Sequence, residues 1–489
     1  MIKKFSIFIG SCLSFFLLWM LWNMFQFSSK QINIPLSKNA EIDSIKAINN
    51  LSKSITYKTI SFEDPSELDS TEFLLFNQFL RDTYPLTFSN LEERNFSKYS
   101  ILLKWNGSQN FELNPILLMA HSDVVPIENL DDWTEAPFAG LIKDDQIIGR
   151  GAIDDKSSLI SILESIEYLL SQNFIPNRDI YVSIGHDEEN TGKYGNAIIS
   201  ETLRNEGIYF DMILDEGSIV SDGIIKGVDL PVAMIGIAEK GYASFELVCN
   251  YKAGHSSMPG KITTIGKLTK AINRLQNKPM NSKIIKPIKK FFDYLGPEMS
   301  LKDRFFISNM SFFKSTITSR LEDNSVTAAM IRTTMAPTII SGGFKSNALP
   351  ETARAVINCR IRQGNSVEKI KNYIVKTIND PDIIVNILEN DFVSNPSKVS
   401  SVISSEFDII HKTIKEIFKE VIVAPGLVVA TTDSRHYQDI SKNIYRFMPI
   451  TLNEHDISMI HGKNERISKE SYLKMIQFYI QFIKNIHDQ

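Results

Sequence analysis

The pattern of apolar and polar residues begins with an uncharged run near the N-terminus. This run extends from Phe5 to Phe27 and directly follows two lysines. It is long enough to cross a bilayer, which takes about 20 apolar residues. Cleavable signals usually end in small residues, whereas this run ends in bulky ones from Trp22 onward. Residues 1–30 are therefore predicted to be an uncleaved membrane anchor, and the alternative is a signal segment on a secreted protein.

The charges beside the run predict its orientation. Lys3, Lys4 and the N-terminal amine outnumber Lys30 on the other side. Because positive charge favours the cytoplasmic side, the N-terminus should stay in the cytoplasm. After a polar linker from residue 28 to about 45, the remainder should lie on the non-cytoplasmic side, in a periplasm, a lumen or the extracellular space.

Strand-like and helix-like patterns alternate from about residue 95. Ile116–Ala120 is uniformly apolar, as in a strand buried on both faces, and Ile180–Ile184 and Met212–Leu214 have the same character. Between the first two, Lys156–Leu170 carries apolar residues at helical spacing. This order predicts an α/β domain with a mainly parallel sheet and helices on both faces.

The pattern changes near residue 240. Tyr242–Tyr251 alternates like a half-exposed strand, and the segment that follows has a β-α-β-β-α-β order, which is typical of a ferredoxin-like domain. Its other elements are expected near 263–276, 328–340, 353–362, 366–377 and 383–388. We therefore expect an anchor or signal at 1–30, a catalytic domain at 45–238 and 393–489, and an inserted α+β domain at 239–392.

One stretch of the inserted segment, residues 277–327, is too long for an ordinary loop and should contain helix. It is rich in aromatic and apolar residues, and these could line a site for a bulky acyl chain or simply pack the domain. They are Phe291, Phe292, Tyr294, Leu295, Phe305, Phe306, Phe312 and Phe313.

Composition narrows the range of functions. A chain of 489 residues exceeds one compact core, so two domains are expected. The net charge of -4 gives no basic footprint for nucleic acid. The three cysteines, Cys12, Cys249 and Cys359, are too far apart for a disulfide scaffold or a cysteine zinc cluster. A metal site in this chain must consist of histidine and carboxylate ligands.

Such ligands follow each of the three apolar strands. The first strand leads into His121-Ser122-Asp123, the second into His186-Asp187-Glu188-Glu189, and the third into Asp215-Glu216-Gly217. In α/β sheets, ligands bind at the carboxyl ends of the strands, so these groups point to one crevice. A glycine-rich turn from Gly149 to Lys156 supplies a further carboxylate just before a helix.

Each piece alone has a simpler explanation. A histidine after a strand is often a core or surface residue, a pair of glutamates is usually solvated, and Asp154 could cap the helix that follows. Together the pieces favour a metal centre, because clustered carboxylates repel one another unless cations neutralise them.

The motifs in their order resemble the two-zinc metallopeptidase family of carboxypeptidase S, aminoacylase and succinyl-diaminopimelate desuccinylase. The resemblance covers residues 60 to 485 and is strongest for the carboxypeptidase S branch, which includes enzymes acting on N-acyl amino acids. The matching motifs are 121–123, 149–156, 187–189, 214–217 (Leu-Asp-Glu-Gly), 254–259 (Gly-His-Ser-Ser-Met-Pro), 347–350 (Asn-Ala-Leu-Pro), 432–435 (Thr-Asp-Ser-Arg) and 461–466 (His-Gly-Lys-Asn-Glu-Arg).

The resemblance implies two zinc ions per chain, with cobalt or manganese as possible substitutes. Asp154 would bridge both metals, and the peptide bond between Asp154 and Asp155 would be cis. Either Asp215 or Glu216 would complete the first site, and we favour Asp215. The implied metal ligands are His121, Asp154, Glu189, Asp215 or Glu216, and His461.

The same resemblance assigns the other roles. Asp123 would orient the ring of His121. Glu188 would be the general base, which takes a proton from the attacking water and passes it to the leaving amine. His255, in the inserted lid or dimerisation domain, would help hold the oxyanion, sometimes from a neighbouring subunit. Arg360 and Asn347 are candidates to bind a substrate carboxylate, since guanidinium matches a carboxylate in two bonds.

The predicted function is zinc-dependent hydrolysis of an amide bond next to a free carboxylate. The substrate would be a small peptide or an N-acyl amino acid, so the enzyme would be a carboxypeptidase, a dipeptidase or an N-acyl amino acid hydrolase, with a homodimer through the lid domain as an open alternative to a monomer. A serine hydrolase is a weaker alternative, because Gly254-His255-Ser256-Ser257-Met258 lacks the second glycine of a nucleophile elbow. A non-catalytic metal-binding module of the same fold is the other alternative.

Overall fold

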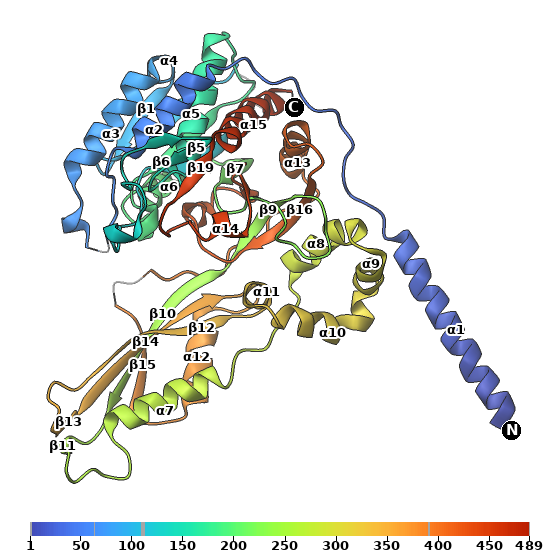
Figure 1. Cartoon of the computed structure of the whole chain (residues 1–489), viewed down its shortest axis with the longest axis vertical. Helices are drawn as coiled ribbons and strands as arrows, with labels where there is room; N and C mark the ends of the chain where they lie inside the picture. The colour runs from blue at the N-terminus through green and yellow to red at the C-terminus, as the bar shows by residue number, and fades with distance from the viewer. Residues whose placement is uncertain (1, 63, 109–112, 390–391, 489) are drawn as a thin grey trace.

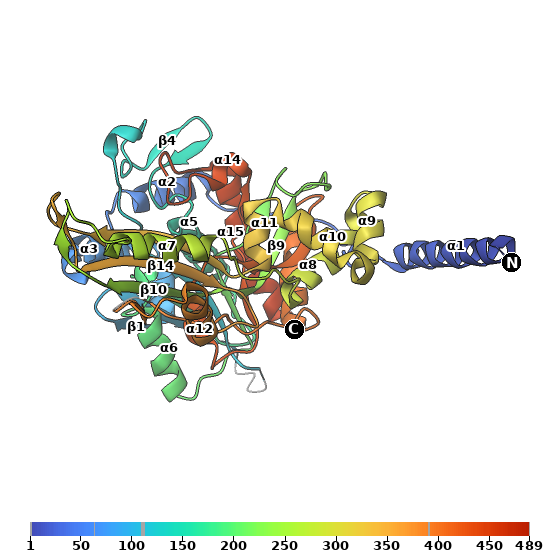
Figure 2. The same cartoon turned by 90° about the horizontal axis from the view of Figure 1, so that it is seen from below.

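The computed structural model describes residues 2–62, 64–108, 113–389 and 392–488. It has a main body, a narrower lobe below it and one long helix beside them (Figure 1). That helix, α1 (Ile2–Gln26), stands clear of the body in two views (Figures 1 and 2). It is long and apolar enough to cross a membrane, and only 6% of the most apolar 18-residue stretch of this helix is buried.

The main body contains a large sheet of ten described strands in the order β1-β2-β6-β3-β7-β17-β9-β8-β18, with β16 also paired to β9. Its centre is parallel, since β3 runs parallel to β6 and β7, and β7 runs parallel to β17. The predicted mainly parallel α/β sheet is confirmed. The strands are β1 (Glu92–Phe96), β2 (Ser100–Trp105), β3 (Ile116–His121), β6 (Ile180–Gly185), β7 (Met212–Asp215), β8 (Val220–Ser221), β9 (Val232–Glu239), β16 (Ile422–Val428), β17 (Ile444–Arg446) and β18 (Thr451–Leu452).

Alternate residues of the central strands pack under helices on opposite faces. On β3, Leu118 belongs to a core shared with α5 (Lys156–Ser171) and α15 (Lys469–His487), whereas Leu117 belongs to a separate core shared with α6 (Asn196–Asn205). Successive strand residues face opposite sides, so a uniformly apolar strand must be covered twice. Helices α2 (Ser44–Ile55), α3 (Ser70–Thr83), α4 (Pro85–Asn90) and α13 (Ser405–Ile417) complete the body.

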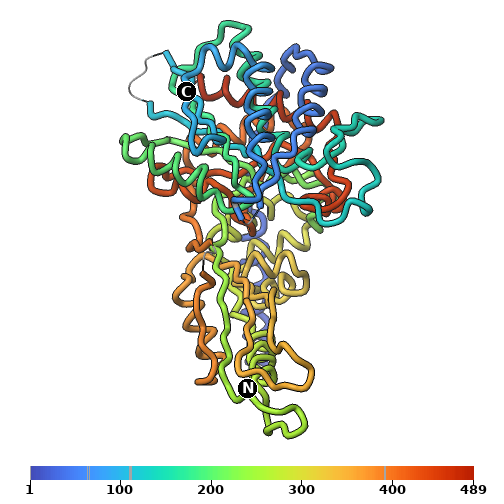
Figure 3. The backbone as a smooth tube through the Cα atoms, turned by 90° about the vertical axis from the view of Figure 1, so that its left-hand side faces the viewer, coloured from blue at the N-terminus to red at the C-terminus, as the bar shows by residue number. Residues whose placement is uncertain are grey.

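The narrower lobe is a four-stranded antiparallel sheet with the order β12-β14-β10-β15. This is the neighbour order of a ferredoxin-like sheet, as the β-α-β-β-α-β pattern predicts. Figure 3 shows the lobe projecting from the body, and the short pair β11 (Gly254–His255) and β13 (Ala348–Leu349) lies at its tip (Figure 1). The larger elements are β10 (Gly241–Asn250), α7 (Thr264–Gln276), β12 (Thr334–Gly342), β14 (Thr352–Ile361), α12 (Val367–Ile378) and β15 (Ile383–Ile387).

Residues 277–327 contain several helices, as their length predicts. Helix α8 (Lys286–Leu295) packs against β16 of the main sheet, and its apolar side chains belong to the main core. Phe291, Phe292, Tyr294 and Leu295 therefore pack the body, although they fall inside the range 239–392 assigned to the inserted domain. The helices α9 (Leu301–Ser308), α10 (Met310–Glu322) and α11 (Ser325–Ile331) follow, and Figure 2 shows α9 and α10 between the body and α1.

A small three-stranded sheet brings together two loops that carry predicted site residues, the turn at 149–156 and the segment 461–466. Its strands are β4 (Leu141–Lys143), β5 (Gln146–Ile148) and β19 (Arg466–Ser468), in the order β19-β5-β4. The turn that begins at Gly149 leaves β5, and the segment from His461 to Glu465, which follows α14 (Glu454–Ile457), enters β19. Because Ile148 pairs with Arg466, these two segments lie side by side.

Candidate metal centre

The three predicted strand ends meet at one edge of the main sheet. His121 is the last residue of β3 and pairs with Gly185, the last residue of β6, so the turn that holds Glu188 and Glu189 lies beside it. Glu216 follows β7 on the other side of β3. The neighbouring strands are parallel, so their carboxyl ends carry these side chains to the same place.

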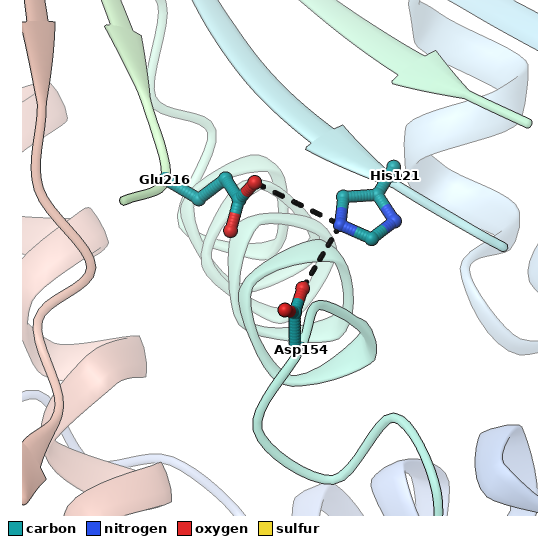
Figure 4. Close-up of side chains that lie close together, drawn as sticks. All are labelled: His121, Asp154 and Glu216. Carbon is teal, nitrogen blue, oxygen red and sulfur yellow. Dashed lines mark hydrogen bonds and ion pairs between the residues drawn. The ribbon is translucent and has the colours of Figure 1, made fainter. Parts of the chain in front are cut away.

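Asp154 lies between two histidines. Its Oδ1 atom is 3.1 Å from Nε2 of His121, and its Oδ2 atom is 3.1 Å from Nε2 of His461. Two groups of potential metal ligands share this carboxylate: His121, Asp154 and Glu216, and Asp154, Glu189 and His461. Figure 4 shows the first group, with the three side chains converging from separate elements. A carboxylate that offers one oxygen to each of two groups has the arrangement of a bridging ligand.

The two groups differ in their exposure to solvent. The side chain of His121 is only 2% exposed, whereas that of His461 is 52% exposed. Nε2 of His461 is also 3.1 Å from Oε2 of Glu189. The group around His461 is therefore the one that opens to solvent.

The acid of the first group is Glu216, not the favoured Asp215. Oε1 of Glu216 is 3.9 Å from Nε2 of His121. The carboxylate of Asp215 is turned away, since its Oδ2 accepts a hydrogen bond from the backbone N–H of Ser434 (2.9 Å) and its Oδ1 accepts one from the backbone N–H of Glu216 (3.0 Å). Asp215 thus ties the site to the segment 432–435.

Asp123 contacts both His121 and the glutamate turn. Its Oδ1 is 3.3 Å from Nδ1 of His121, and its backbone oxygen is 3.0 Å from the same nitrogen. Two acceptors at Nδ1 favour a proton there, which leaves Nε2 free to bind a metal. The same carboxylate accepts hydrogen bonds from the backbone N–H groups of Glu188 and Glu189, both at 3.1 Å. Asp123 therefore positions a ligand and the turn that holds the expected base.

Glu465 holds the turn around Asp154. Its Oε1 accepts hydrogen bonds from the backbone N–H groups of Gly151 (3.1 Å), Ile153 (2.8 Å) and Asp154 (3.1 Å), and its Oε2 is 2.7 Å from Nη1 of Arg150. The peptide bond after Asp154 is cis, as the resemblance implies. Glu465 lies within the motif 461–466, but no role was predicted for it, because its partners in the turn around Asp154 are about 310 positions away in the sequence.

The carboxylates are crowded and short of positive charge. Burial raises the pKa of Glu216, and the charge of Asp154 raises it further. Burial and the charge of Asp154 also raise the pKa of Glu189 to about 7. Hydrogen bonds to Asp154 and Glu189 raise the pKa of His461 to about 10. Oε1 of Glu189 is buried and has no hydrogen-bond partner among the residues that the structure describes. A donor set of this kind fits divalent cations, which would neutralise the charge and occupy the unpaired oxygen.

Glu188 belongs to neither ligand group among the described residues. Burial, followed by the charges of Asp433 and Glu189, raises its pKa. Nη1 of Arg435 is 3.8 Å from its Oε1. Arg435 is itself held by bonds to the backbone oxygens of Thr432 (2.8 Å) and Thr191 (2.6 Å). A carboxylate beside the ligands but outside both groups can accept a proton without leaving a metal. The position of Arg435 was not anticipated.

The three lobe residues do not reach the metal centre. His255 is exposed in β11 at the lobe tip, where its Nδ1 is 2.7 Å from Oγ of Ser257. Asn347 is also exposed near the tip, and its backbone oxygen accepts from the N–H of Ser256 (3.2 Å). Arg360 lies near the other end of β14, with its guanidinium 4.7 Å from the ring centroid of Tyr242.

Arg360 and Asn347 are therefore not neighbours in space, contrary to our expectation. Eight residues of extended strand separate Arg360 from the start of β14 at Thr352, which corresponds to about 26 Å at 3.3 Å per residue. Only Arg360, at the base of the lobe, lies near the body.

A family model described as peptidase family M20/M25/M40 matches residues 117–485. Probable carboxypeptidase S-like 2 from Dictyostelium discoideum is 39% identical over 479 residues, which cover 96% of this chain and 92% of that protein. The N-fatty-acyl-amino acid synthase/hydrolase PM20D1 from Xenopus tropicalis is 37% identical over 453 residues, covering 92% and 88%.

The fold is also similar to a solved structure. An M20 family metallo-carboxypeptidase from Sulfolobus solfataricus superposes with a TM-score of 0.67 at 19% identity, and the match covers 91% of this chain and 99% of that one. The matched family segment contains all five residues of the two groups of potential ligands, from His121 to His461.

Proposed function

This chain belongs to peptidase family M20/M25/M40, and we propose that it holds two zinc ions and hydrolyses an amide bond next to a free carboxylate. Amide-bond hydrolysis is supported by the description of the family as a peptidase family and by relatives named as a probable carboxypeptidase and an N-fatty-acyl-amino acid synthase/hydrolase. The observation that carries the proposal is the position of Asp154 between His121 and His461, because one shared carboxylate links two ligand groups beside a free glutamate.

The proposed ligands are divided between two sites. His121, Asp154 and Glu216 would hold one zinc, and Asp154, Glu189 and His461 the other. Two cations bound there would lower the pKa of a water molecule and would stabilise negative charge on the carbonyl oxygen under attack. Asp123 keeps the His121 ring in place, and Glu465 keeps the Asp154 turn in place.

The role of general base is assigned to Glu188. Its raised pKa fits a group that takes a proton from the attacking water and returns it to the leaving amine. Arg435, 3.8 Å away, holds the glutamate on the side of the ligands. The chain contains the proposed base and all of the proposed ligands, which argues against a non-catalytic module of this fold.

The proposed substrate is a small peptide or an N-acyl amino acid with a free carboxylate. Relatives named as carboxypeptidases and as N-fatty-acyl-amino acid hydrolases support this class. Arg360 is the proposed carboxylate-binding residue, because it lies at the base of the lobe and carries a guanidinium. Neither His255 nor Asn347 can assist at the metal centre of its own chain without a movement of the lobe, so a role for them requires closure or a second subunit.

Helix α1 is proposed to anchor the protein in a membrane, with the catalytic body on the non-cytoplasmic side; a secreted form is the alternative. Its uncharged run and the lysines before it support this orientation.

A substrate screen tests the proposed reaction. The full chain in detergent would be loaded with zinc and given N-acyl amino acids, dipeptides and the same compounds with amidated carboxylates. We expect release of a free amine or amino acid from the acids, and its loss on chelation. Activity that survives chelation, or equal cleavage of acids and amides, would contradict the proposal.

A further inference from the structure

The helical pair α9–α10 mixes charged residues with a group of aromatic side chains, and little of the pair is fully buried. Among residues 301–322, Asn309 and Ile317 alone are buried. Leu301 is 71% exposed and Phe312 is 61% exposed. The aromatic residues of this pair pack mainly on one another, with Phe306 and Phe313 at 4.7 Å between ring centroids.

The same pair is bound to the last turns of α1. The side chain of Asn309 donates to the backbone oxygen of Met20 (3.1 Å), and the side chain of Asn23 donates to Oδ1 of Asn309 (2.9 Å). The rings of Phe16 and Phe312 lie 5.0 Å apart. Figures 1 and 2 show α9 and α10 beside the end of α1 nearest the body.

The positions of these contacts along α1 determine how deep they would lie in a membrane that α1 spans. The charged residues nearest the apolar run are Lys4 and Lys30. A membrane span takes about 20 residues, and every such stretch between these lysines includes residues 10–24. Phe16, Met20 and Asn23 are therefore inside the hydrocarbon wherever the span begins. Side chains that touch them must lie in the bilayer too.

We infer that the tip of the α9–α10 pair, residues 309–312, is a second membrane-inserted element that lies in the phospholipid bilayer beside α1. This inference rests on the proposed anchoring of α1. It explains the asparagine pair, because polar groups in hydrocarbon must bind one another, and Asn309 also donates to the backbone oxygen of Phe305 (2.9 Å). The exposed Lys302 and Lys314 flank the tip and can extend to the headgroups.

The insertion can be measured with an environment-sensitive fluorophore on single cysteines of the full chain. Cys249 and Cys359 are buried, so the exposed Cys12 of α1 is the native labelling site and reports on α1. In a Cys12→Ser background, Phe312→Cys and Ser311→Cys report on the tip. Ile175→Cys is the control, because Ile175 is 58% exposed in a loop beside the C-terminus, where the Asn177 side chain donates to the His487 backbone oxygen. Thermal melting checks that each variant folds.

Each protein would be placed in phosphatidylcholine nanodiscs with and without lipids that carry a nitroxide on the acyl chain. Because the quencher is confined to a hydrocarbon layer about 30 Å thick, we expect at least about fivefold more quenching at 12, 311 and 312 than at 175.

The outcomes separate the two proposals. Quenching at 12 but not at 311 or 312 overturns the inserted tip and leaves the anchor intact. No quenching at 12 overturns the anchor and the tip with it. If 311 and 312 are shielded from an aqueous quencher but not quenched by the lipid, another protein chain covers them, which also overturns the inference.

Discussion

The carboxylate of Glu465 accepts a hydrogen bond from the backbone N–H of Asp154, the residue that links the two ligand groups. Glu465 is fully buried, and its second oxygen pairs with Arg150. The carboxylate that the two ligand groups share is thus held in place by a residue that belongs to neither group among the described residues.

Glu465→Gln should therefore weaken zinc binding although no ligand is changed. Glutamine keeps the shape but loses the charge opposite the buried Arg150. Loss of such outer contacts typically costs about 10- to 100-fold in metal affinity. Titration with a competing chelator measures the effect. Glu470→Gln, at an exposed position in α15, is the control and should bind zinc normally. Unchanged affinity in Glu465→Gln would refute a positioning role.

Glu216 and Asp215 should differ in metal stoichiometry. Glu216→Ala removes a proposed ligand of the His121 group, so bound zinc should fall from two ions to one per chain. Asp215→Asn keeps an oxygen that can accept from the Ser434 N–H, so both ions should remain. Elemental analysis of the dialysed proteins gives the count. The reverse result would restore Asp215 as the ligand.

The adjacent acids Asp215 and Glu216 show which features of the site can be predicted from the sequence and which cannot. Uniformly apolar strands followed by His and carboxylates predict one polar crevice, because parallel strands end on the same side of a sheet. They do not decide between adjacent acids, since consecutive residues at a strand end point in opposite directions. The choice depends on Ser434, about 220 positions away, whose N–H occupies Asp215.

Contacts between segments that are distant in the sequence could not be predicted either. Glu465 and Arg435 lay in recognised motifs, but their partners come from the turn at 150–154 and from Glu188. The lobe order was predictable from its elements, whereas the separation of Asn347 from Arg360 follows from the full extension of β14.

Arg360→Ala should lower kcat/KM on a free acid by about tenfold or more, because this is the loss expected when one charge-assisted hydrogen bond to the substrate is removed. On the amidated substrate the same substitution should have little effect, because no carboxylate remains to bind. Arg354→Ala is a matched control on the same strand, where the guanidinium pairs with Glu246 (2.8 Å). Equal losses on acid and amide would show that Arg360 does not bind the substrate carboxylate.

Acid should destabilise the body through His411. Burial, followed by the nearby charge of Lys415, lowers the pKa of this histidine to about 4, against about 6.5 in an unfolded chain. Between these values the unfolded chain binds more protons, so stability falls as the pH drops from about 6.5 towards 4. His411→Leu should lose less melting temperature between pH 7 and pH 5 than the native chain, whereas His487→Leu, at an exposed site, should match it. An unchanged pH dependence in His411→Leu would refute this account.

The most direct test of the two-metal mechanism is the turnover of Glu188→Gln. Glutamine cannot take a proton from water, and Glu188 belongs to neither ligand group among the described residues. The variant should keep two zinc ions per chain and lose about 10²–10⁴-fold in kcat on an N-acyl amino acid. His121→Ala, the companion variant, should lose metal as well as turnover. A near-normal kcat in metal-loaded Glu188→Gln would contradict the assignment of the base and the mechanism built on it.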